Sequence, residues 1–424
     1  MRASMFHTMS RAIPAALIGV SLAAATSACA NVITDWDAKA IDAVAPLASA
    51  PSSPYTPYAA YRMMGIVHAA MFDAVNSIER RYRPYLVQLP ADSAASKEAA
   101  AAAAAAAVLA TIDAKTAAQM KGDLASYLAS MPDGAAKSEG VNLGEAVAGK
   151  ILEARANDGC DAPDDYRPRT TPGVYVPTAI MRGPMWPNAK TFAMVSPSQF
   201  RPGPPVALDS SEWAKDFNEI KDYGSQKSAK RTAEQTETAR FWLVTGPVAY
   251  HPFLRQLAIA KEMDVVESAR FMALGGIAIN DALIAVLDAK YHFNFWRPVT
   301  AIRNGDIDGN PATDREATWQ PLGDTPTHPE YPCAHCILSG SSVAGVVKAV
   351  LGTDDIPEVA MTSPTAPGVT HRWTSTVALT EEVANARIWS GFHYRFSTRV
   401  GTEMGRQIGE YVVRNVMPVV TSSR

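Results

Sequence analysis

Residues 290–298 read Lys-Tyr-His-Phe-Asn-Phe-Trp-Arg-Pro and follow a long stretch of helical character at 264–289. Lys290 and Arg297 are seven positions apart, which is nearly two helical turns, so in a continuous helix both side chains lie on one face. The aromatic residues between them favour burial over a solvent-exposed face, and a buried cation needs an anionic partner. The segment therefore predicts two cationic side chains that converge on one anion.

Helical patterns dominate the rest of the chain, and few segments show the strict alternation of a half-buried strand. We therefore predict an all-α protein. Thr56 and Pro57 resemble an N-cap and a first helical position, and nine consecutive alanines at 99–107 favour a closely packed helix. The predicted helices cover residues 58–78, 99–107, 114–128, 135–156, 212–223, 231–243, 264–289, 337–351, 379–390 and 398–416.

The middle of the chain is rich in proline. Ten of the thirty prolines lie between Pro163 and Pro205, which excludes a long helix there, and the aromatic residues of this stretch favour an ordered connection over a flexible linker. We predict a signal peptide at 1–30 and a single domain at 31–424. Within that domain we expect an N-terminal helical half at about 31–160, the Pro-rich connection at 161–208 and a C-terminal half at 209–424.

The first thirty residues have the order of a signal peptide. Arg2 and Arg11 come first, an apolar run at 13–25 follows, and small residues lead to Ala30. We therefore expect an exported protein, periplasmic or secreted. A lipoprotein anchored at Cys29 fits less well, because Thr26 stands where such sites usually carry a large aliphatic residue.

Net charge and hydropathy exclude two classes of partner. The formal charge of −3 leaves no global basic surface for nucleic acid or an anionic membrane, so any anion must be bound by a local cluster. The apolar stretch 271–287 contains Asn280 and Asp281, which indicates a core helix and not a membrane span. Four cysteines are too few for a disulfide scaffold.

A second segment combines histidines with a predicted helix start. It reads His328-Pro-Glu-Tyr-Pro332-Cys333-Ala334-His335-Cys336 and precedes the helical stretch 337–351. Pro332 suits a first helical position, which leaves the backbone N–H groups of Cys333, Ala334 and His335 unpaired. Such groups form an anion site, and His335 can also exchange a proton with the bound group.

A third segment reads Arg387-Ile-Trp-Ser-Gly391-Phe-His393-Tyr-Arg395. Gly391 is expected to close the preceding helix, so that His393 points in a different direction from a continuous helical position. Taken alone, His393 fits a satisfied core histidine better than a ligand. The functional interpretation depends on the three segments together.

In this order, Lys-x6-Arg-Pro, Pro-x-x-His at a helix start and Arg-x3-Gly-x-His resemble the oxyanion signature of the vanadium-dependent haloperoxidases. The type-2 phosphatidic-acid phosphatases are their relatives. The stretch Asn294-Phe-Trp-Arg-Pro-Val-Thr-Ala-Ile-Arg303 is especially close to bacterial haloperoxidase-like members, as are 64–75 and 231–242. The resemblance implies helical bundles of the haloperoxidase and acid phosphatase type.

The resemblance also implies a pocket for vanadate. Lys290, Arg297 and Arg387 neutralise the oxygens of the anion, His393 bonds directly to vanadium, and His335 is the acid-base group. In the peroxidase reaction, hydrogen peroxide replaces an oxygen on vanadium, Lys290 polarises it, and a halide is oxidised to a hypohalous equivalent.

Further roles follow from the same resemblance. Cys333 and Ala334 occupy positions next to the acid-base histidine, where the family usually has Ser and Gly that bind the anion. His328 falls where bromide-type members carry His and chloride-type members carry Phe, so bromide or iodide is favoured over chloride.

The sequence departs from the family pattern around the expected site. A thiol at Cys333 is a weaker donor than a hydroxyl and is open to oxidation, to sulfenic acid or a disulfide. Ala386 replaces the Ser that usually precedes the third-motif arginine. Ser397 stands where many members place an Asp that orients the metal-binding histidine, which predicts a less basic His393.

Two alternatives remain. The same pocket can hydrolyse a small phosphomonoester, with phosphate as substrate or inhibitor, a phosphohistidine at His393 and His335 as acid. Alternatively, His328, Cys333, His335 and Cys336 form a non-catalytic zinc site or thiol switch. The partners are then either hydrogen peroxide and halide or a phosphoester, and the sequence leaves a homo-oligomer open.

Overall fold

The computed structural model describes residues 31–49 and 57–420. The signal-peptide prediction at 1–30 and the expected N-cap Thr56 lie outside these residues. The described residues are mostly helical, so the all-α prediction is confirmed apart from one hairpin. The N-terminal part contains α1 (Val32–Ser49), α2 (Pro57–Glu79), α3 (Lys97–Leu109), α4 (Ala114–Ala129) and α5 (Ala135–Arg155).

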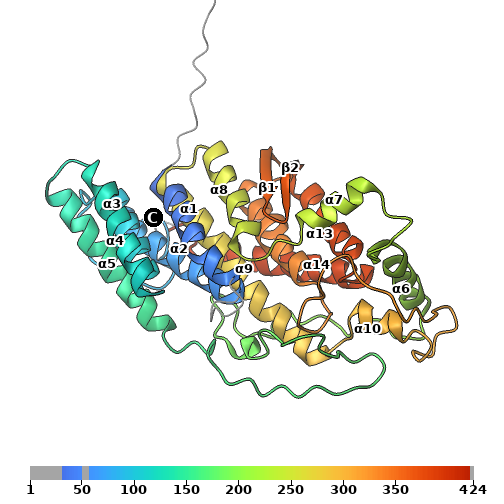
Figure 1. Cartoon of the computed structure of the whole chain (residues 1–424). Helices are drawn as coiled ribbons and strands as arrows, with labels where there is room; N and C mark the ends of the chain where they lie inside the picture. The colour runs from blue at the N-terminus through green and yellow to red at the C-terminus, as the bar shows by residue number, and fades with distance from the viewer. Residues whose placement is uncertain (1–30, 50–56, 421–424) are drawn as a thin grey trace, which may run out of the picture.

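The C-terminal part is also built from helices. They are α6 (Ser211–Gly224), α7 (Ala233–Phe241), α8 (His251–Ala260), α9 (Val265–Phe293), α10 (Pro298–Arg303), α11 (Ala334–Ser339), η3 (Gly340–Val347), α12 (Lys348–Leu351), α13 (Thr376–Trp389) and α14 (Arg395–Asn415). Figure 1 shows α3, α4 and α5 at one end of the molecule and α6 and α10 at the other, with α9 between them. A hairpin of β1 (Asp355–Ser363) and β2 (Ala366–Ser375) pairs Val359 with Trp373.

The alanine-rich helix α3 is buried because its neighbour α5 approaches its backbone directly. A Cβ atom on Gly140 would lie 2.5 Å from the Ser96 carbonyl oxygen, and one on Gly144 would lie 2.2 Å from the Ala100 carbonyl oxygen. Nine alanines offer no side chain that would hold the two helices apart. This close approach fixes the N-terminal helices against α2.

Helix α9 forms the central element of the core. It and the continuous helix Ala334–Leu351 are long and apolar enough to cross a membrane, but 94% and 67% of their apolar windows are buried inside the protein. Asn280 donates from Nδ2 to the Tyr61 carbonyl (2.9 Å), and Asp281 accepts the backbone N–H groups of 192–194. These polar residues therefore join α9 to α2 and to the Pro-rich segment, as in a core helix.

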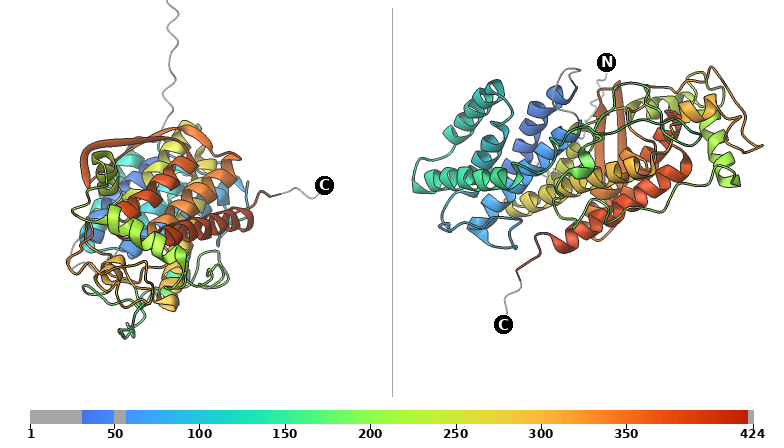
Figure 2. Two further views of the ribbon diagram at one scale, coloured as in Figure 1. Left: turned by 90° about the vertical axis from the view of Figure 1, so that its right-hand side faces the viewer. Right: turned by 90° about the horizontal axis from the view of Figure 1, so that it is seen from below.

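The Pro-rich segment 161–208 runs along the molecule in extended form (Figure 1). It contacts the first motif directly: Tyr175 donates its N–H to the Asn294 carbonyl (2.8 Å), and Trp296 donates to the Gly173 carbonyl (3.0 Å). Figure 2 shows the same arrangement from two further sides, with α14 lying beside α9. The connection thus helps to place the residues that follow α9.

Candidate functional site

A cavity of about 460 Å³ lies where the second and third sequence motifs meet, and the first motif contacts its wall through Arg297. Its polar end is formed by His328, Ala334, His335, Arg387 and His393. The other walls are more apolar and come from α2, α9, the helix after Cys333 and the loop 243–246, while Arg182 and the segment 324–327 add polar groups. The structure therefore brings together residues that are up to 65 positions apart in sequence, from 328 to 393.

The first motif is not a continuous helix, which corrects the expectation of one shared helical face. Helix α9 ends at Phe293, Asn294 has a left-handed backbone (φ 52°), and Arg297 is the N-cap of α10. The completely buried guanidinium of Arg297 donates from Nε to the His328 carbonyl (2.8 Å) and from Nη2 to His328 Nδ1 (3.0 Å). Arg297 Nη1 donates to the Phe392 carbonyl (3.0 Å) and to His393 Nε2 (3.3 Å). Arg297 thus connects the second and third motifs.

Lys290 has a different environment from the one expected. Its buried ammonium donates to the carbonyl oxygens of Pro329 (3.0 Å), Glu330 (2.6 Å) and Pro332 (2.5 Å), and it does not line the cavity. Burial and the neighbouring Arg297 lower the pKa of Lys290. Three carbonyl acceptors nevertheless match the three N–H groups of a protonated amine, so Lys290 positions the segment 329–332 beside the cavity.

The second motif differs from the expectation at its helix start. Cys333, and not a residue before it, is the N-cap of α11, and its own N–H donates to the Ser397 carbonyl (3.3 Å). The backbone N–H groups of Ala334 and His335 have no partner within 31–49 and 57–420. The anion site predicted at this helix end therefore retains two of the three expected donors.

Cys333 and Cys336 form a disulfide in the first turn of α11. Cys333 therefore offers no thiol donor to an anion, which corrects the role expected from its position. Zinc binds cysteine as a thiolate, and neither sulfur of a disulfide is a thiolate. The zinc alternative is therefore wrong for this arrangement.

His335 lies in the cavity wall and contacts the backbone of the 243–250 segment. Its Nε2 is 2.8 Å from the Val244 carbonyl oxygen, which can only accept, so Nε2 carries the proton and Nδ1 has the free lone pair. Burial, with Arg387 nearby, lowers the pKa of His335 to about 3. His335 is therefore a neutral base at physiological pH.

In the third motif, the helix end predicted at Gly391 is confirmed. Helix α13 ends at Trp389, and Gly391 has φ 78°, where a Cβ atom would lie 2.6 Å from the Gly224 carbonyl oxygen. Arg387 is 2% exposed and donates from Nη1 to the Trp242 carbonyl (2.5 Å), while its buried Nε has no partner among the described residues. Burial lowers the pKa of Arg387 to about 9.

Glu330 supplies the orienting carboxylate that the family pattern places at the position of Ser397. Its Oε1 is 2.8 Å from His393 Nδ1 and accepts the N–H of Tyr394 (3.1 Å). Because Arg297 Nη1 can only donate to His393 Nε2, the proton of His393 is on Nδ1 and the lone pair is on Nε2. Glu330 was missed although it is the only acidic residue of the second motif. Burial raises its pKa to about 7.

The buried charges of the site do not balance. Lys290, Arg297 and Arg387 are at most 2% exposed, whereas the buried carboxylate of Glu330 pairs with His393 and acts on Lys290 and Arg297 only through its charge. A buried excess of positive charge requires an anion. The unpaired Nε of Arg387 and the N–H groups of Ala334 and His335 are donors for such an anion. The Nε2 lone pair of His393 accepts from Arg297 in this structure and would become a metal ligand by exchanging that contact. The residues present therefore fit vanadate or phosphate.

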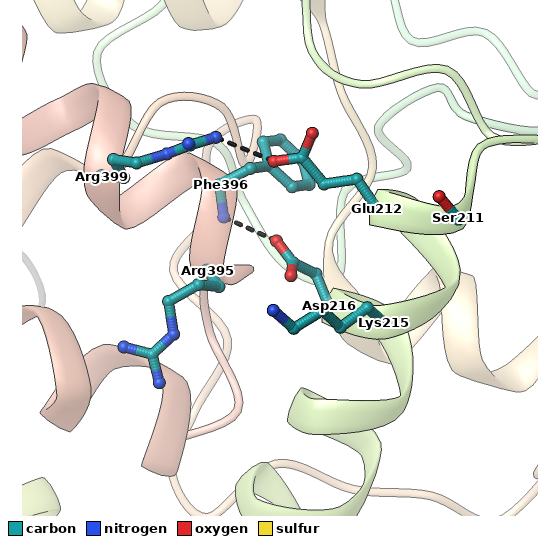
Figure 3. A pocket seen from close by; sticks show the side chains of 7 residues that line it. All are labelled: Ser211, Glu212, Lys215, Asp216, Arg395, Phe396 and Arg399. Carbon is teal, nitrogen blue, oxygen red and sulfur yellow. Dashed lines mark hydrogen bonds and ion pairs between the residues drawn. The ribbon is translucent and has the colours of Figure 1, made fainter.

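Helix α6 packs against the residues that directly follow His393. Asp216 Oδ2 accepts the Phe396 N–H (2.7 Å) in the first turn of α14, directly after His393, and burial raises the pKa of Asp216 to about 6. Trp213 packs on Tyr394 with ring centroids 4.9 Å apart. Figure 3 shows the surface pocket between α6 and α14, where Asp216 and Glu212 face Phe396 and Arg399. This pocket lies outside the polar end of the cavity.

Asp216→Ala is expected to lower the free energy of unfolding by about 1 kcal/mol, because the first turn of α14 loses its only side-chain acceptor among the described residues. Glu212→Ala, on the same helix, removes only an exposed ion pair with Arg399 and should cost less than about 0.5 kcal/mol. Urea unfolding followed by circular dichroism measures both. Equal losses in the two variants would argue against the capping role.

A separate buried cluster joins α1, α2 and α8. Asp37 Oδ1 is 2.9 Å from His68 Nε2 and 3.0 Å from His251 Nδ1, and Asp37 Oδ2 accepts from Arg255 (2.8 Å). His68 thus pairs with Asp37 and not with the nearby Asp73, which accepts backbone N–H groups of 85–87. Arg255 already balances the charge of Asp37, so a hydrogen-bonded connection explains these residues better than a metal site.

Known proteins resemble this chain in sequence and in fold. Residues 270–422 match the family model described as the VCPO second helical-bundle domain. The vanadium chloroperoxidase of Curvularia inaequalis is 30% identical over 140 residues, which cover 27% of this chain and only 22% of that protein.

Solved structures extend the likeness to the rest of the chain. The first bacterial vanadium-dependent iodoperoxidase has a TM-score of 0.78 and 23% identity, over 92% of this chain and 98% of that one. An apo-type bacterial vanadium-dependent chloroperoxidase has a TM-score of 0.70 and 19% identity, over 87% and 95%. The resemblance found in the sequence is thus confirmed: the chain is vanadium haloperoxidase-like, with the helical-bundle fold of these enzymes and a matching second helical-bundle domain.

Proposed function

We propose that this protein is a vanadate-dependent haloperoxidase-like enzyme that uses hydrogen peroxide to oxidise a halide. One observation carries the proposal: Arg387 lines the cavity, and the buried cation Arg297 contacts His393, a histidine of the cavity whose Nε2 lone pair is set by its neighbours. The buried Lys290 lies close to both arginines and adds to the positive charge. A bound anion would balance these charges, and vanadate would use that lone pair as a ligand of its metal.

Bound vanadate would supply the Lewis-acidic centre that activates hydrogen peroxide. His393 would hold it through Nε2, with Glu330 fixing the imidazole through Nδ1. Arg387 and Arg297 would neutralise its oxygens, and the N–H groups of Ala334 and His335 would donate to it. His335 Nδ1 would accept a proton from entering peroxide, since Nε2 is already held by Val244.

For the halide we propose bromide or iodide in preference to chloride. His328 lines the cavity, and its Nδ1 lies 3.0 Å from Arg297 Nη2 and 3.2 Å from the Pro329 carbonyl oxygen. When Nδ1 accepts from Arg297, Nε2 carries the proton and can donate to an incoming anion. Burial keeps the imidazole neutral by lowering its pKa, with Arg297 adding to the effect.

Phosphomonoester hydrolysis is the second candidate, and Glu330 is the observation that favours it. A nucleophilic histidine benefits from an orienting carboxylate, and His393 has one at 2.8 Å. In that case His393 Nε2 attacks phosphorus, and His335, protonated in the complex, donates to the leaving alcohol.

One assay separates the two functions. With orthovanadate, hydrogen peroxide and each of iodide, bromide and chloride, we expect halide oxidation in the order iodide, bromide, chloride, and no oxidation without vanadate. In parallel, p-nitrophenyl phosphate should be hydrolysed at a much lower rate and inhibited by vanadate. Fast hydrolysis combined with no vanadate-dependent oxidation would favour the phosphatase.

A further inference from the structure

The cavity is larger than the proposed reaction of inorganic substrates requires. Vanadate, peroxide and one halide amount to about seven water-sized groups, or roughly 200 Å³ at about 30 Å³ each. The cavity measures about 460 Å³. The cavity as a whole falls in the size range of sites for organic ligands, and the space left beside the inorganic substrates is large enough for one aromatic ring.

The walls of this remaining space are mixed: Arg182, Thr245, Asp324, Thr325 and Thr327 contribute polar groups, and the rest is apolar or aromatic. Leu243, Leu283, Leu338 and Phe392 line it, and α2 contributes Tyr58 and Tyr61. Tyr58 is 9% exposed and Tyr61 is 2% exposed, yet neither hydroxyl has a hydrogen-bond partner among the described residues. A nearly buried hydroxyl without a protein partner is unfavourable unless a ligand or solvent in the cavity completes its hydrogen bonding.

The two tyrosines differ in this respect from a third at the same site. Tyr250 uses its hydroxyl to donate to the His335 carbonyl (3.0 Å), which explains its buried position. Tyr58 also lies within electrostatic reach of Arg297, so its ring is close to the polar end of the cavity. Aromatic rings and unpaired hydroxyls on one wall suit an aromatic ligand that carries an oxygen substituent.

We propose that Tyr58 and Tyr61 form a subsite for a phenol-type organic substrate, held beside the halide-oxidising centre in the same cavity. The proposal rests on the proposed function, because the subsite would place a ring carbon next to newly oxidised halide. Overall, ring C–H, halide, peroxide and one proton give ring C–X and two waters. The halide loses two electrons, the O–O bond of peroxide accepts them, and the ring proton leaves in water.

Binding of 2-naphthol and of naphthalene tests the subsite without turnover. The protein is saturated with phosphate, and each probe is titrated by fluorescence into wild type, Tyr58→Phe, Tyr61→Phe and the double variant. Each lost hydroxyl should weaken 2-naphthol about three- to tenfold, whereas naphthalene, which lacks the oxygen, should change less than twofold. Tyr127→Phe, in α4 and outside the cavity, is the matched control and should leave both affinities unchanged.

The outcomes distinguish this inference from the proposed function. Equal weakening of both probes, or no weakening of 2-naphthol, overturns the subsite, and unchanged naphthalene binding shows that the variants remain folded. Failure of wild type to bind orthovanadate would instead overturn the proposed function and leave the probe affinities as they are. In turnover, the wild type should brominate 2-naphthol with a ring-position ratio different from that of free hypobromite, and the double variant should approach the free ratio.

Discussion

His393→Ala is expected to abolish vanadate binding, whereas His335→Ala should bind vanadate and lose turnover. Among the described residues, His393 is the only histidine of the cavity whose Nδ1 contacts a carboxylate, so its lone pair is on Nε2. Loss of this ligand should reduce affinity at least about 100-fold, or roughly 3 kcal/mol. His335 only accepts a proton in the proposed chemistry, so its loss should lower kcat about 10²- to 10⁴-fold at nearly constant affinity.

Vanadium NMR or calorimetric titration of the apoprotein with orthovanadate measures the affinity, and iodide oxidation measures turnover. His292→Ala is the matched control, because His292 belongs to the first motif but is exposed and contacts only the ring of Phe293. It should retain both properties. Equal loss of vanadium binding in the two site variants would contradict the assigned roles.

The helices and the three motifs could be predicted because their signals are local. Each predicted helix corresponds to a helix of the structure with ends within a few residues, and the helix stop at Gly391 follows from a backbone that only glycine adopts easily. Helices α1, α8 and α10 and the hairpin β1–β2 were not predicted. Their patterns are short or mixed, and the hairpin is held mainly by packing against α8, α13 and α7.

The relation between Lys290 and Arg297 could not be read from their spacing. The spacing argument assumed a continuous helix, but Asn294 adopts a left-handed conformation that ends it, and asparagine signals this only weakly. Arg297 still reaches the site because it begins α10, while Lys290 holds the backbone of 329–332. The residue types correctly indicated buried cations near the site, whereas the relative positions of Lys290 and Arg297 depended on the backbone conformation of Asn294.

Glu330 was missed for a different reason. Its contact with His393 joins residues 63 positions apart, and no local pattern records such a pairing. The family pattern places the orienting carboxylate at position 397, four residues after His393, where this chain has Ser397. In the structure, the carboxylate of Glu330 from the second motif contacts Nδ1 of His393 instead. The disulfide between Cys333 and Cys336 likewise required two side chains to be placed on one helical turn.

Glu330→Gln should weaken vanadate binding about tenfold at pH 8, as expected when an outer partner of a metal-binding histidine loses its charge. The variant should also lose a pH dependence of the wild type. Burial raises the pKa of Glu330 to about 7, so the carboxylate is ionised above that pH and protonated below it. Wild-type affinity should therefore fall as the pH decreases through 7, relative to the variant. Because the folded-state pKa is raised, this group makes the fold less stable as the pH rises from about 4.5 to 7.

Glu330→Gln has two opposite effects on the affinity for vanadate, and a comparison with the affinity for phosphate separates them. Removing a negative charge from among Lys290, Arg297 and Arg387 strengthens the attraction for any anion, whereas removing the partner of Nδ1 weakens His393 as a ligand. Phosphate responds only to the first effect and should bind Glu330→Gln as well as or better than wild type, while vanadate binds less well.

Glu382→Gln is the matched control, since Glu382 pairs with His371 at 2.8 Å outside the cavity. If vanadate and phosphate both bind more tightly to Glu330→Gln, the field of the cations outweighs the His393 bond, and the orienting role of Glu330 is refuted.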